Sequence, residues 1–234
     1  MDGPILQEPF KSGVGELPLP VVHGMTLGEL ALMINKEGWM HAGKDALELT
    51  VIPCQNYTHQ TKTKLICNPS PNLKDMRAIY LYPSTCYFEK TAVSVCRGTT
   101  LPFEAYGSPY LKDIGSNLFS FTPQSMEGAN NPQFSGQTCY GRDLREIPLD
   151  EILDAGLDLR YLIDAYRDLK EAHPEIDFFG KPDKHGYYWI DLLMGTDEVR
   201  NLIIEGKDAD QVKESWADDV AAFMEQRQPY LLYE

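Results

Sequence analysis

Ala78-Ile79-Tyr80-Leu81-Tyr82-Pro83 is a short run of apolar and aromatic residues that ends at a proline, and Ser84-Thr85-Cys86-Tyr87-Phe88-Glu89 follows it directly. Isoleucine and tyrosine favour strands, and proline does not continue one. The run therefore predicts a short strand over residues 78–83. Glu89 would then lie just beyond a Pro-Ser-Thr turn.

Further strands are predicted on both sides of this run. Residues 47–53 alternate, with Leu47, Leu49 and Val51 separated by polar residues. Residues 117–122 and 137–142 have strand character, and a loop rich in glycine, asparagine and proline separates them. The first 24 residues are rich in proline and glycine, which indicates an extended segment with turns.

The C-terminal third has the pattern of helices. Residues 148–173 carry a broad apolar face at helical spacing, and residues 196–204 and 208–227 follow as two shorter helices. An earlier helix is predicted after Thr26, because Thr26 and Glu29 form a capping box. The tail, residues 230–233, is apolar and is expected to dock as a strand.

Strands early and helices late predict an α/β (mixed α+β) fold. We expect one domain over residues 1–234, with a mixed sheet in the first 145 residues and helices in the C-terminal third. No internal repeat, low-complexity segment or clear linker divides the chain.

Charge excludes several classes of function. The net charge is −14, and 23 acidic against 11 basic residues in 141–234 account for most of it. So acidic a chain is a poor binder of nucleic acid, and the acidic third is interpreted as solvated helix faces. There is no apolar run of membrane-spanning length and no visible signal peptide.

The motifs of the commonest enzyme families are absent, and nothing in the sequence requires a metal or an organic cofactor. Five cysteines occur without a C-x-x-C pair. Cys54, His59 and Cys67 could approach one metal, although buried or free thiols are the favoured interpretation.

Carboxylates, one arginine and many aromatic residues suggest a carbohydrate site. Glu89 stands beside Phe88, and a carboxylate between aromatic groups suits a general acid because it loses solvation. Arg97 precedes Gly98 and Thr99, and its guanidinium could capture a carboxylate. An ordinary helix-start glutamate and an internal salt bridge are the structural alternatives.

Other polar and aromatic residues are weaker candidates. His23 could carry a proton, although a hydrogen-bonded structural histidine is the favoured interpretation. Two carboxylates near turns or strand ends, Glu104 and Asp143, are more suited to structural roles. Three tryptophans could stack on sugars, namely Trp39, Trp189 and Trp216, although core packing is favoured for Trp216.

Five stretches together resemble one family, the NamZ-type exo-β-N-acetylmuramidases. The resemblance runs from end to end of the chain. The stretches are Asp2-Gly3-Pro4 with residues 18–30 (Pro18 to Leu30), Pro69-Ser70-Pro71-Asn72, residues 82–89, Ser94-Val95-Cys96-Arg97-Gly98-Thr99, and Arg227 with Tyr230-Leu231-Leu232-Tyr233.

The resemblance implies release of terminal N-acetylmuramic acid from peptidoglycan fragments during bacterial cell-wall turnover. Family members pair a Rossmann-like N-terminal domain with a mixed α/β C-terminal domain, and their site lies between the two. This chain is expected to be a C-terminal-type domain only, truncated or with a separate N-terminal partner. A cell-envelope, periplasmic or secreted location is implied.

The resemblance also suggests site residues. Glu89 is the expected acid/base or positioning carboxylate, and Arg97 is expected to bind the lactyl carboxylate of N-acetylmuramic acid, with Thr99 nearby. The remaining expected substrate contacts are Gly98, His23, Asn72 and Tyr82. The family usually has glycine at the positions of Lys90 and Cys96, and asparagine is common at that of Ala92.

Three other functions remain open. The chain could bind muropeptides without cleaving them. It could be a truncated protein without activity. Outside the family, it could be an interaction domain whose acidic helices bind a basic partner and no sugar.

Overall fold

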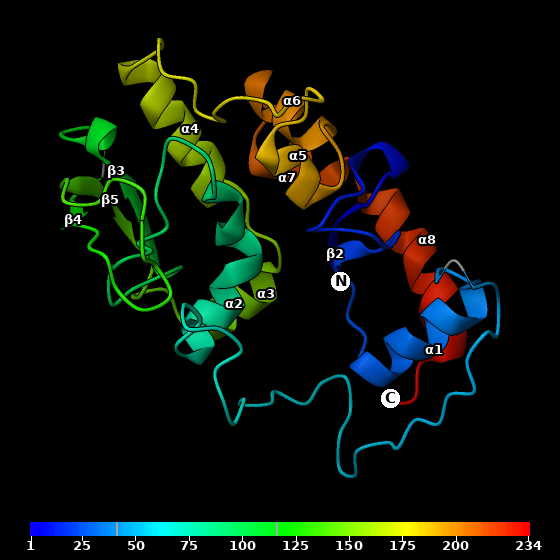
Figure 1. Cartoon of the computed structure of the whole chain (residues 1–234). Helices are drawn as coiled ribbons and strands as arrows, with labels where there is room; N and C mark the ends of the chain where they lie inside the picture. Colours follow the sequence, from blue (N-terminus) through cyan, green and yellow to red (C-terminus); the bar gives the residue numbers. More distant parts are fainter. Residues whose placement is uncertain (41, 116) are drawn as a thin grey trace.

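The computed structural model describes residues 1–40, 42–115 and 117–234. Two small antiparallel sheets and eight α-helices are assigned within these ranges (Figure 1). A hairpin pairs β1 (Asp2–Ile5) with β2 (Pro20–Val22), and a second sheet has the order β3 (Ala105–Ser108), β5 (Cys139–Asp143), β4 (Phe119–Phe121). The mixed α/β class is confirmed, but the strands form two separate sheets.

The helices account for more of the chain than the strands do. They are α1 (Leu27–Glu37), α2 (Met76–Thr85), α3 (Leu149–Ala155), α4 (Arg160–Ala172), α5 (Trp189–Met194), α6 (Glu198–Ile204), α7 (Ala209–Glu214) and α8 (Ala217–Arg227). None of the helices in the described ranges has the length and apolar character needed to cross a membrane.

Figure 1 shows the three-stranded sheet at one end, α2, α3 and α4 beside it, and α1 with α8 at the other end. The main core lies between the sheet and the helices. Phe88 stacks on Tyr106 of β3 with ring centroids 4.7 Å apart, and both rings are buried. Leu162, Leu169 and Phe178 belong to the same buried cluster.

The predicted strand over residues 78–83 is wrong, because α2 covers this stretch. The Asp75 side chain caps the helix by accepting a hydrogen bond from the Ala78 backbone N–H at 2.9 Å. Ala78, Leu81 and Thr85 are buried, and their spacing is that of one helical face. Pro83 lies inside the helix near its end.

Two long predicted helices are each broken. Gly156, with φ of +66°, ends α3, and the Leu157 N–H then donates to the carboxylate of Asp2 at 3.1 Å. The second break separates α7 from α8. There the buried Trp216 donates its indole N–H to the same carboxylate at 2.9 Å. Asp2 in β1 therefore accepts a hydrogen bond from the chain at each of the two breaks.

Two predicted strands have no counterpart. Residues 47–53 have no regular secondary structure. The tail forms a 3-10 turn, η4 (Gln228–Tyr230), and then docks on α1 without forming a strand. The strands expected near 117–122 and 137–142 are confirmed as β4 and β5, and so is the helix that begins at the Thr26–Glu29 capping box.

Glu29 connects α1 with the tail and with the segment before α2. One carboxylate oxygen accepts from the Leu232 N–H at 2.7 Å and lies 3.0 Å from His59 Nε2; the other accepts from Thr26. Burial acts to raise the pKa of Glu29, but these hydrogen bonds outweigh it and hold the pKa below its usual value.

We expect Glu29→Gln to lower the free energy of unfolding by about 1–3 kcal/mol at pH 7, because the amide cannot accept every hydrogen bond. The native pKa lies below the unfolded value of about 4.3. The ionised carboxylate therefore stabilises fully above that value, and this stability is lost as pH falls through the native pKa.

Urea unfolding between pH 3 and pH 7 would measure this effect. The difference in the free energy of unfolding between the parent and Glu29→Gln should become smaller as pH falls. Glu214→Gln, at an exposed position in α7, is the matched control and should differ little from the parent throughout. A difference that becomes larger at low pH would contradict stabilisation by the ionised Glu29 carboxylate.

Candidate functional site

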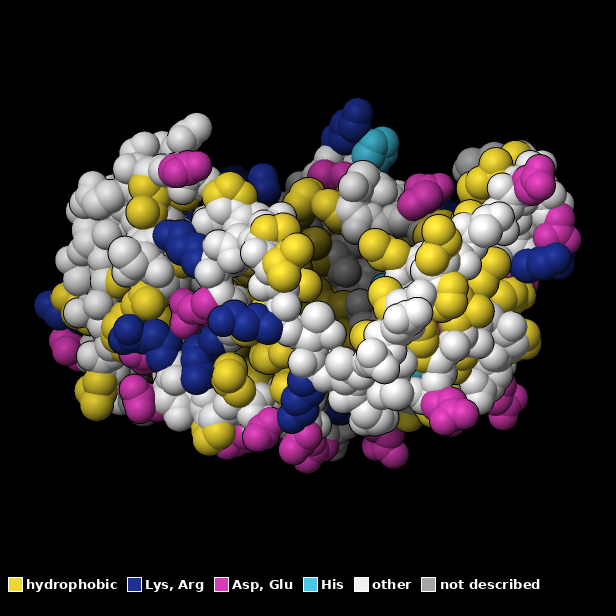
Figure 2. Space-filling view, turned by 90° about the horizontal axis from the view of Figure 1, so that it is seen from below, with side chains coloured by type: hydrophobic (Ala, Val, Ile, Leu, Met, Phe, Trp, Pro, Cys, Tyr) yellow, Lys and Arg dark blue, Asp and Glu magenta, His cyan; other side chains and the backbone are white. Residues whose placement is uncertain are grey.

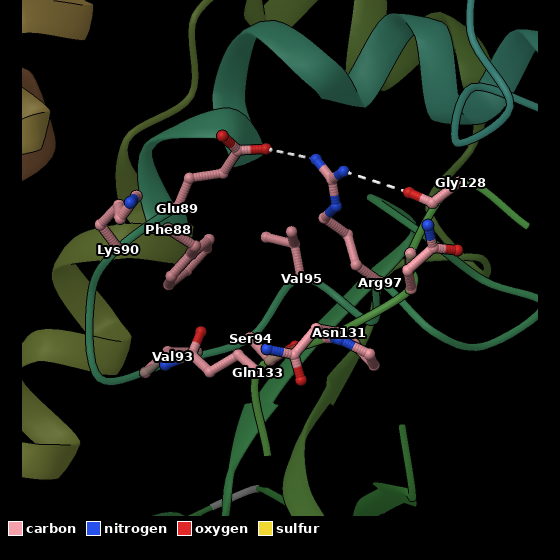
Figure 3. Close-up of a pocket in the computed structure, with 13 residues that line it drawn as sticks. Phe88, Glu89, Lys90, Val93, Ser94, Val95, Arg97, Gly128, Asn131 and Gln133 are labelled. Atoms are coloured by element: carbon pink, nitrogen blue, oxygen red, sulfur yellow. Dashed lines mark hydrogen bonds and ion pairs between the residues drawn. The ribbon is translucent and has the colours of Figure 1, made fainter. Parts of the chain in front are cut away.

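A cavity of about 370 Å³ opens beside Glu89 and Arg97 (Figure 3). Three segments line it: residues 88–90 after α2, residues 93–97 before β3, and residues 128–133 in the loop between β4 and β5. The volume lies in the range of small-molecule sites, which is about 300–1,000 Å³. The cavity is therefore large enough for a sugar unit.

Glu89 and Arg97 form an ion pair at the rim. Arg97 Nη1 donates to Glu89 Oε1 at 2.9 Å, and Arg97 Nη2 donates to the Gly128 carbonyl at 3.3 Å. Figure 3 shows the carboxylate and the guanidinium pointing toward one another above Val95. Both side chains are partly exposed, so a ligand in the cavity can reach them.

Local structure explains the position of Glu89. The chain leaves α2 through the 3-10 turn η2 (Cys86–Phe88), and Phe88 is buried in the core. Glu89 is the cap residue of that turn, and its backbone N–H donates to the Cys86 carbonyl at 3.1 Å. Because Phe88 is buried, its neighbour Glu89 emerges at the cavity.

The loop that forms the opposite wall is held by hydrogen bonds. Asn72, which is buried, donates to the Gly128 carbonyl at 2.9 Å, so that carbonyl is held by Asn72 and Arg97 together. Gln133 donates to the Thr91 carbonyl at 2.7 Å. These bonds fix the loop against the segment that carries Glu89.

Lys90 and Cys96 stand where the resembling family usually has glycine, and both have positive φ, 65° and 60°. Left-handed backbone is unfavourable for residues with a Cβ, which explains a preference for glycine there. Lys90 extends over the Trp189 ring, with Nζ 5.3 Å from the centroid. Lys90 lines the cavity, whereas the Cys96 side chain is buried behind it.

We expect Lys90→Gly to raise the free energy of unfolding by about 0.5–1 kcal/mol, since glycine relieves the left-handed strain. Lys112 is a matched control: it lies over Tyr140, with Nζ 5.9 Å from the centroid, but its φ is −63°. Lys112→Gly should lower stability by a similar amount. Urea unfolding of both variants measures these opposite changes in the free energy of unfolding. Destabilisation by Lys90→Gly would contradict strain at position 90.

The predicted site residues separate into two groups. Glu89 and Arg97 line the cavity, and Asn72 supports its wall. Tyr82 lies close by: burial raises its pKa, with smaller contributions from Cys86, Glu89 and the opposing Arg97. Its ring packs on Phe103 with centroids 4.9 Å apart.

Gly98, Thr99 and His23 do not line this cavity. Gly98, with φ of +84°, packs against Pro132 from behind the loop. The Thr99 hydroxyl donates to the Cys96 carbonyl at 2.7 Å and accepts from the Leu101 N–H at 3.0 Å, so it stabilises a turn. Direct substrate contact by Gly98 or Thr99 is not supported by this geometry.

His23 lies beside a second cavity, of about 490 Å³, formed by the β1–β2 hairpin and the end of α5. Burial lowers its pKa, and the nearby Arg227 guanidinium lowers it further. Arg227 Nη1 donates to the Gly24 carbonyl, which ties α8 to the end of β2. The structure therefore separates His23 from the Glu89–Arg97 pair.

Several lining residues were missed at the sequence level, namely Ser94, Asn130, Asn131 and Gln133. For Asn130 and Asn131 the sequence signal is the composition of the loop over residues 123–132, which predicts a loop and no role. Ser94 belongs to a stretch that carries the family resemblance, but no role was assigned to it. The weaker candidates lie elsewhere: Glu104, Asp143, Trp39 and Trp216 are absent from the lining. Among the described residues no cluster of His, Cys, Asp or Glu is arranged to hold a metal, including Cys54, His59 and Cys67.

The charges define what the site can do. Glu89, Lys90 and Arg97 are its charged lining residues, so cations outnumber carboxylates. The lining of Ser94, Asn130, Asn131 and Gln133 adds hydroxyl and amide groups, with Phe88, Val93 and Val95 as the apolar part. Such a lining suits a polyhydroxylated ligand that carries an anionic group.

Comparison with known proteins adds the family. Residues 80–233 match the model "Exo-beta-N-acetylmuramidase NamZ, C-terminal", and residues 1–77 match "Exo-beta-N-acetylmuramidase NamZ, N-terminal". Our assignment of residues 1–234 to one C-terminal-type domain did not foresee the second match. The boundary between the two models falls at the start of α2.

Relatives with known names or structures are longer than this chain. The peptidoglycan beta-N-acetylmuramidase NamZ of Bacillus subtilis is 31% identical over the whole chain, which spans 56% of that protein. A solved DUF1343 family protein of Bacteroides fragilis is 49% identical with a TM-score of 0.88. A second one is 20% identical with a TM-score of 0.71 and supports the fold alone.

The chain covers 62% of each of these two solved chains. The C-terminal model alone accounts for more than half of the residues, from α2 to the tail, and it includes both members of the Glu89–Arg97 pair. The chain belongs to the family of the NamZ exo-β-N-acetylmuramidases.

Proposed function

We propose that this chain is the part of a peptidoglycan β-N-acetylmuramidase that holds the terminal N-acetylmuramic acid unit, with the sugar in the cavity beside Glu89 and Arg97. The observation that carries the proposal is the Glu89–Arg97 pair at the rim of that cavity. The family and the muramidase activity named for the Bacillus subtilis relative support it.

Arg97 recognises the lactyl carboxylate, which distinguishes N-acetylmuramic acid from N-acetylglucosamine. A guanidinium has five N–H groups, and the hydrogen bonds to Glu89 and Gly128 use one N–H each on Nη1 and Nη2. The other N–H groups can bind a carboxylate of the ligand without breaking the pair. Lys90 adds positive charge at the same wall.

Glu89 is the acid/base or positioning carboxylate. Glycoside hydrolysis ordinarily needs two carboxyl groups, about 5–5.5 Å apart for retention or about 6.5–9.5 Å apart for inversion. Among the described residues, Glu89 is the only carboxylate that lines the cavity. The second group is therefore expected from polypeptide that the longer relatives contain and this chain does not match.

Hydrolysis of a disaccharide with terminal β-linked N-acetylmuramic acid tests the proposal, with release of the free sugar followed by chromatography. Turnover supports a hydrolase, and because the substrate is cell-wall material we place the activity at the cell envelope. Absence of both turnover and binding would refute the proposal.

A non-catalytic muropeptide-binding module is a second candidate function. The described residues place a single carboxylate in the cavity lining, and this favours the binding module, since binding needs Arg97 but no carboxylate pair. Calorimetric binding of the same disaccharide without release of sugar would distinguish the module from the hydrolase.

Arg97→Ala should weaken the binding of N-acetylmuramic acid compounds by about 10–150-fold. This corresponds to the loss of one hydrogen bond to a charged group, which contributes about 1.5–3 kcal/mol. Affinity for N-acetylglucosamine analogues should change much less. Calorimetry with both ligands measures the difference. Arg145→Ala, which breaks an exposed pair with Asp143 outside the cavity, is the control. An equal loss for both ligands would rule out lactyl recognition by Arg97.

A further inference from the structure

Lys90 occupies a turn position that favours glycine. Residues 88–91 form a type II turn, in which Glu89 has φ of −59° and ψ of 130° and Lys90 has φ of +65°. The Thr91 N–H closes the turn by donating to the Phe88 carbonyl at 3.0 Å. The third residue of such a turn needs positive φ and is ordinarily glycine or asparagine. A lysine here breaks a local rule directly beside the cavity.

The surrounding structure keeps Lys90 in this conformation. The Thr91 hydroxyl donates to the Phe88 carbonyl at 2.8 Å, in addition to the bond from the Thr91 N–H. On the other side, a Cβ on Gly180 would lie 2.7 Å from the Lys90 carbonyl oxygen, so the two backbones are in close contact. Strained backbone that its surroundings hold in place is typical of functional sites. The conformation points to a role for the Lys90 side chain.

The Lys90 ammonium is available to a ligand. Its Nζ lies 5.3 Å from the centroid of the Trp189 ring, and the residue is exposed where it lines the cavity. Within the part of the chain that the structure describes, no hydrogen bond or ion pair engages this ammonium. Arg97, by contrast, is paired with Glu89. A lysine ammonium is a point charge with three N–H donors, which suits a phosphoryl group.

The order of the charged groups indicates which part of the sugar meets Lys90. Figure 3 shows Glu89 between Lys90 and Arg97. Around a pyranose ring, C1 stands between C3, which carries the lactyl ether of N-acetylmuramic acid, and C5, which carries C6 and its hydroxyl group. With the lactyl carboxylate at Arg97 and C1 at Glu89, the C5 side of the sugar faces Lys90.

We propose that the cavity takes N-acetylmuramic acid that carries a phosphoryl group on O6, and that Lys90 binds this group. The inference rests on the proposed function, which places the sugar beside Glu89 and Arg97. Such a ligand carries two separate anionic groups, and the lining offers two separate cations for them. Lys90 would therefore determine specificity at O6. Phosphoryl transfer to O6 is the class of reaction that must supply this substrate.

Calorimetry with three ligands tests the proposal. They are a disaccharide with terminal β-linked N-acetylmuramic acid, its 6-phosphate and the methyl diester of that phosphate. We expect this chain to bind a phosphorylated ligand at least about tenfold more tightly than the plain disaccharide, the effect of one hydrogen bond to a charged group. Tighter binding of the monoester would identify a free sugar phosphate as the substrate, and tighter binding of the diester a sugar linked through its phosphate.

Matched variants separate the ammonium from the backbone strain. Lys90→Met removes the charge and keeps an unbranched side chain, so the preference for the phosphorylated ligand should fall by at least about tenfold. Lys90→Arg keeps the charge and should retain most of the preference. Lys112→Met is the control, because Lys112 also lies over an aromatic ring, that of Tyr140, but is absent from the cavity lining. Both ligands are compared on each variant, so a partial loss of folded protein cancels in the ratio.

The outcomes distinguish this inference from the proposed function. Equal affinity of the parent for the plain and phosphorylated ligands would overturn the inference and leave the proposed function standing. A preference that Lys90→Met does not reduce, or that Lys112→Met reduces as much, would remove Lys90 as its cause. Binding of none of the three ligands would refute the proposed function itself.

Discussion

Glu89→Gln is expected to lower kcat for release of N-acetylmuramic acid by about 10²–10⁴-fold, the usual contribution of a positioned acid or base. Glutamine has nearly the same shape, and its carbonyl oxygen can still accept the hydrogen bond from Arg97, which spans 2.9 Å in the parent. The cavity should therefore keep its form and its affinity for the sugar. KM should change by less than kcat.

Glu127→Gln is the control for this experiment. Glu127 is an exposed carboxylate next to Gly128 in the same loop, but it lies outside the cavity lining. Its kcat should equal that of the parent, and both variants should unfold at the same temperature as the parent. Full activity in Glu89→Gln would remove Glu89 from the chemistry and leave it a partner of Arg97.

Local signals in the sequence predicted the elements that depend on neighbouring residues. The Thr26–Glu29 capping box marks the start of α1 because both of its hydrogen bonds close within four residues. The capping signal of Asp75 was missed, and the short run over residues 78–83 does not distinguish a strand from a helix by itself. The helix forms because it buries Ala78 and Leu81 together on one face.

Contacts between distant residues explain the other differences. The helix breaks near Gly156 and Trp216 both depend on Asp2, which lies more than 150 residues away in the chain. No periodicity within a window of 18 residues contains that information. Residues 47–53 show the opposite case, in which a strand pattern is present but the residues that the structure describes form no strand beside it.

The candidate site also combines residues that are close in the sequence with residues that are distant in it. Glu89 and Arg97 are eight residues apart, and their types already suggested a carboxylate and a carboxylate-binding cation. The opposite wall is brought in by the Asn72–Gly128 hydrogen bond, across 56 residues. Thr99 was assigned by resemblance, and His23 was also considered as a proton carrier with a structural role favoured; the hydrogen bonds of both residues show structural roles.

The sheet behind the cavity depends on two glycines that face each other. Gly141 in the central strand β5 pairs with Gly107 of β3 and also with Phe119 of β4. A Cβ on Gly141 would lie 1.9 Å from the Tyr106 carbonyl oxygen and 2.6 Å from the Gly107 Cα. Gly107 in turn exchanges two backbone hydrogen bonds with Ser94, which lines the cavity.

Gly141→Ala should therefore lower the free energy of unfolding by about 3–5 kcal/mol, because the methyl group meets backbone atoms that no rotamer change can move. That is a large share of the roughly 5–15 kcal/mol that stabilises a domain. Gly13→Ala is the control: a Cβ there meets nothing within 4 Å, and its stability should stay within about 0.5 kcal/mol of the parent. Urea unfolding at pH 7 measures both variants. A loss below about 1 kcal/mol in Gly141→Ala would show that β3 and β5 pair in another register, and Ser94 would then lose its place in the cavity wall.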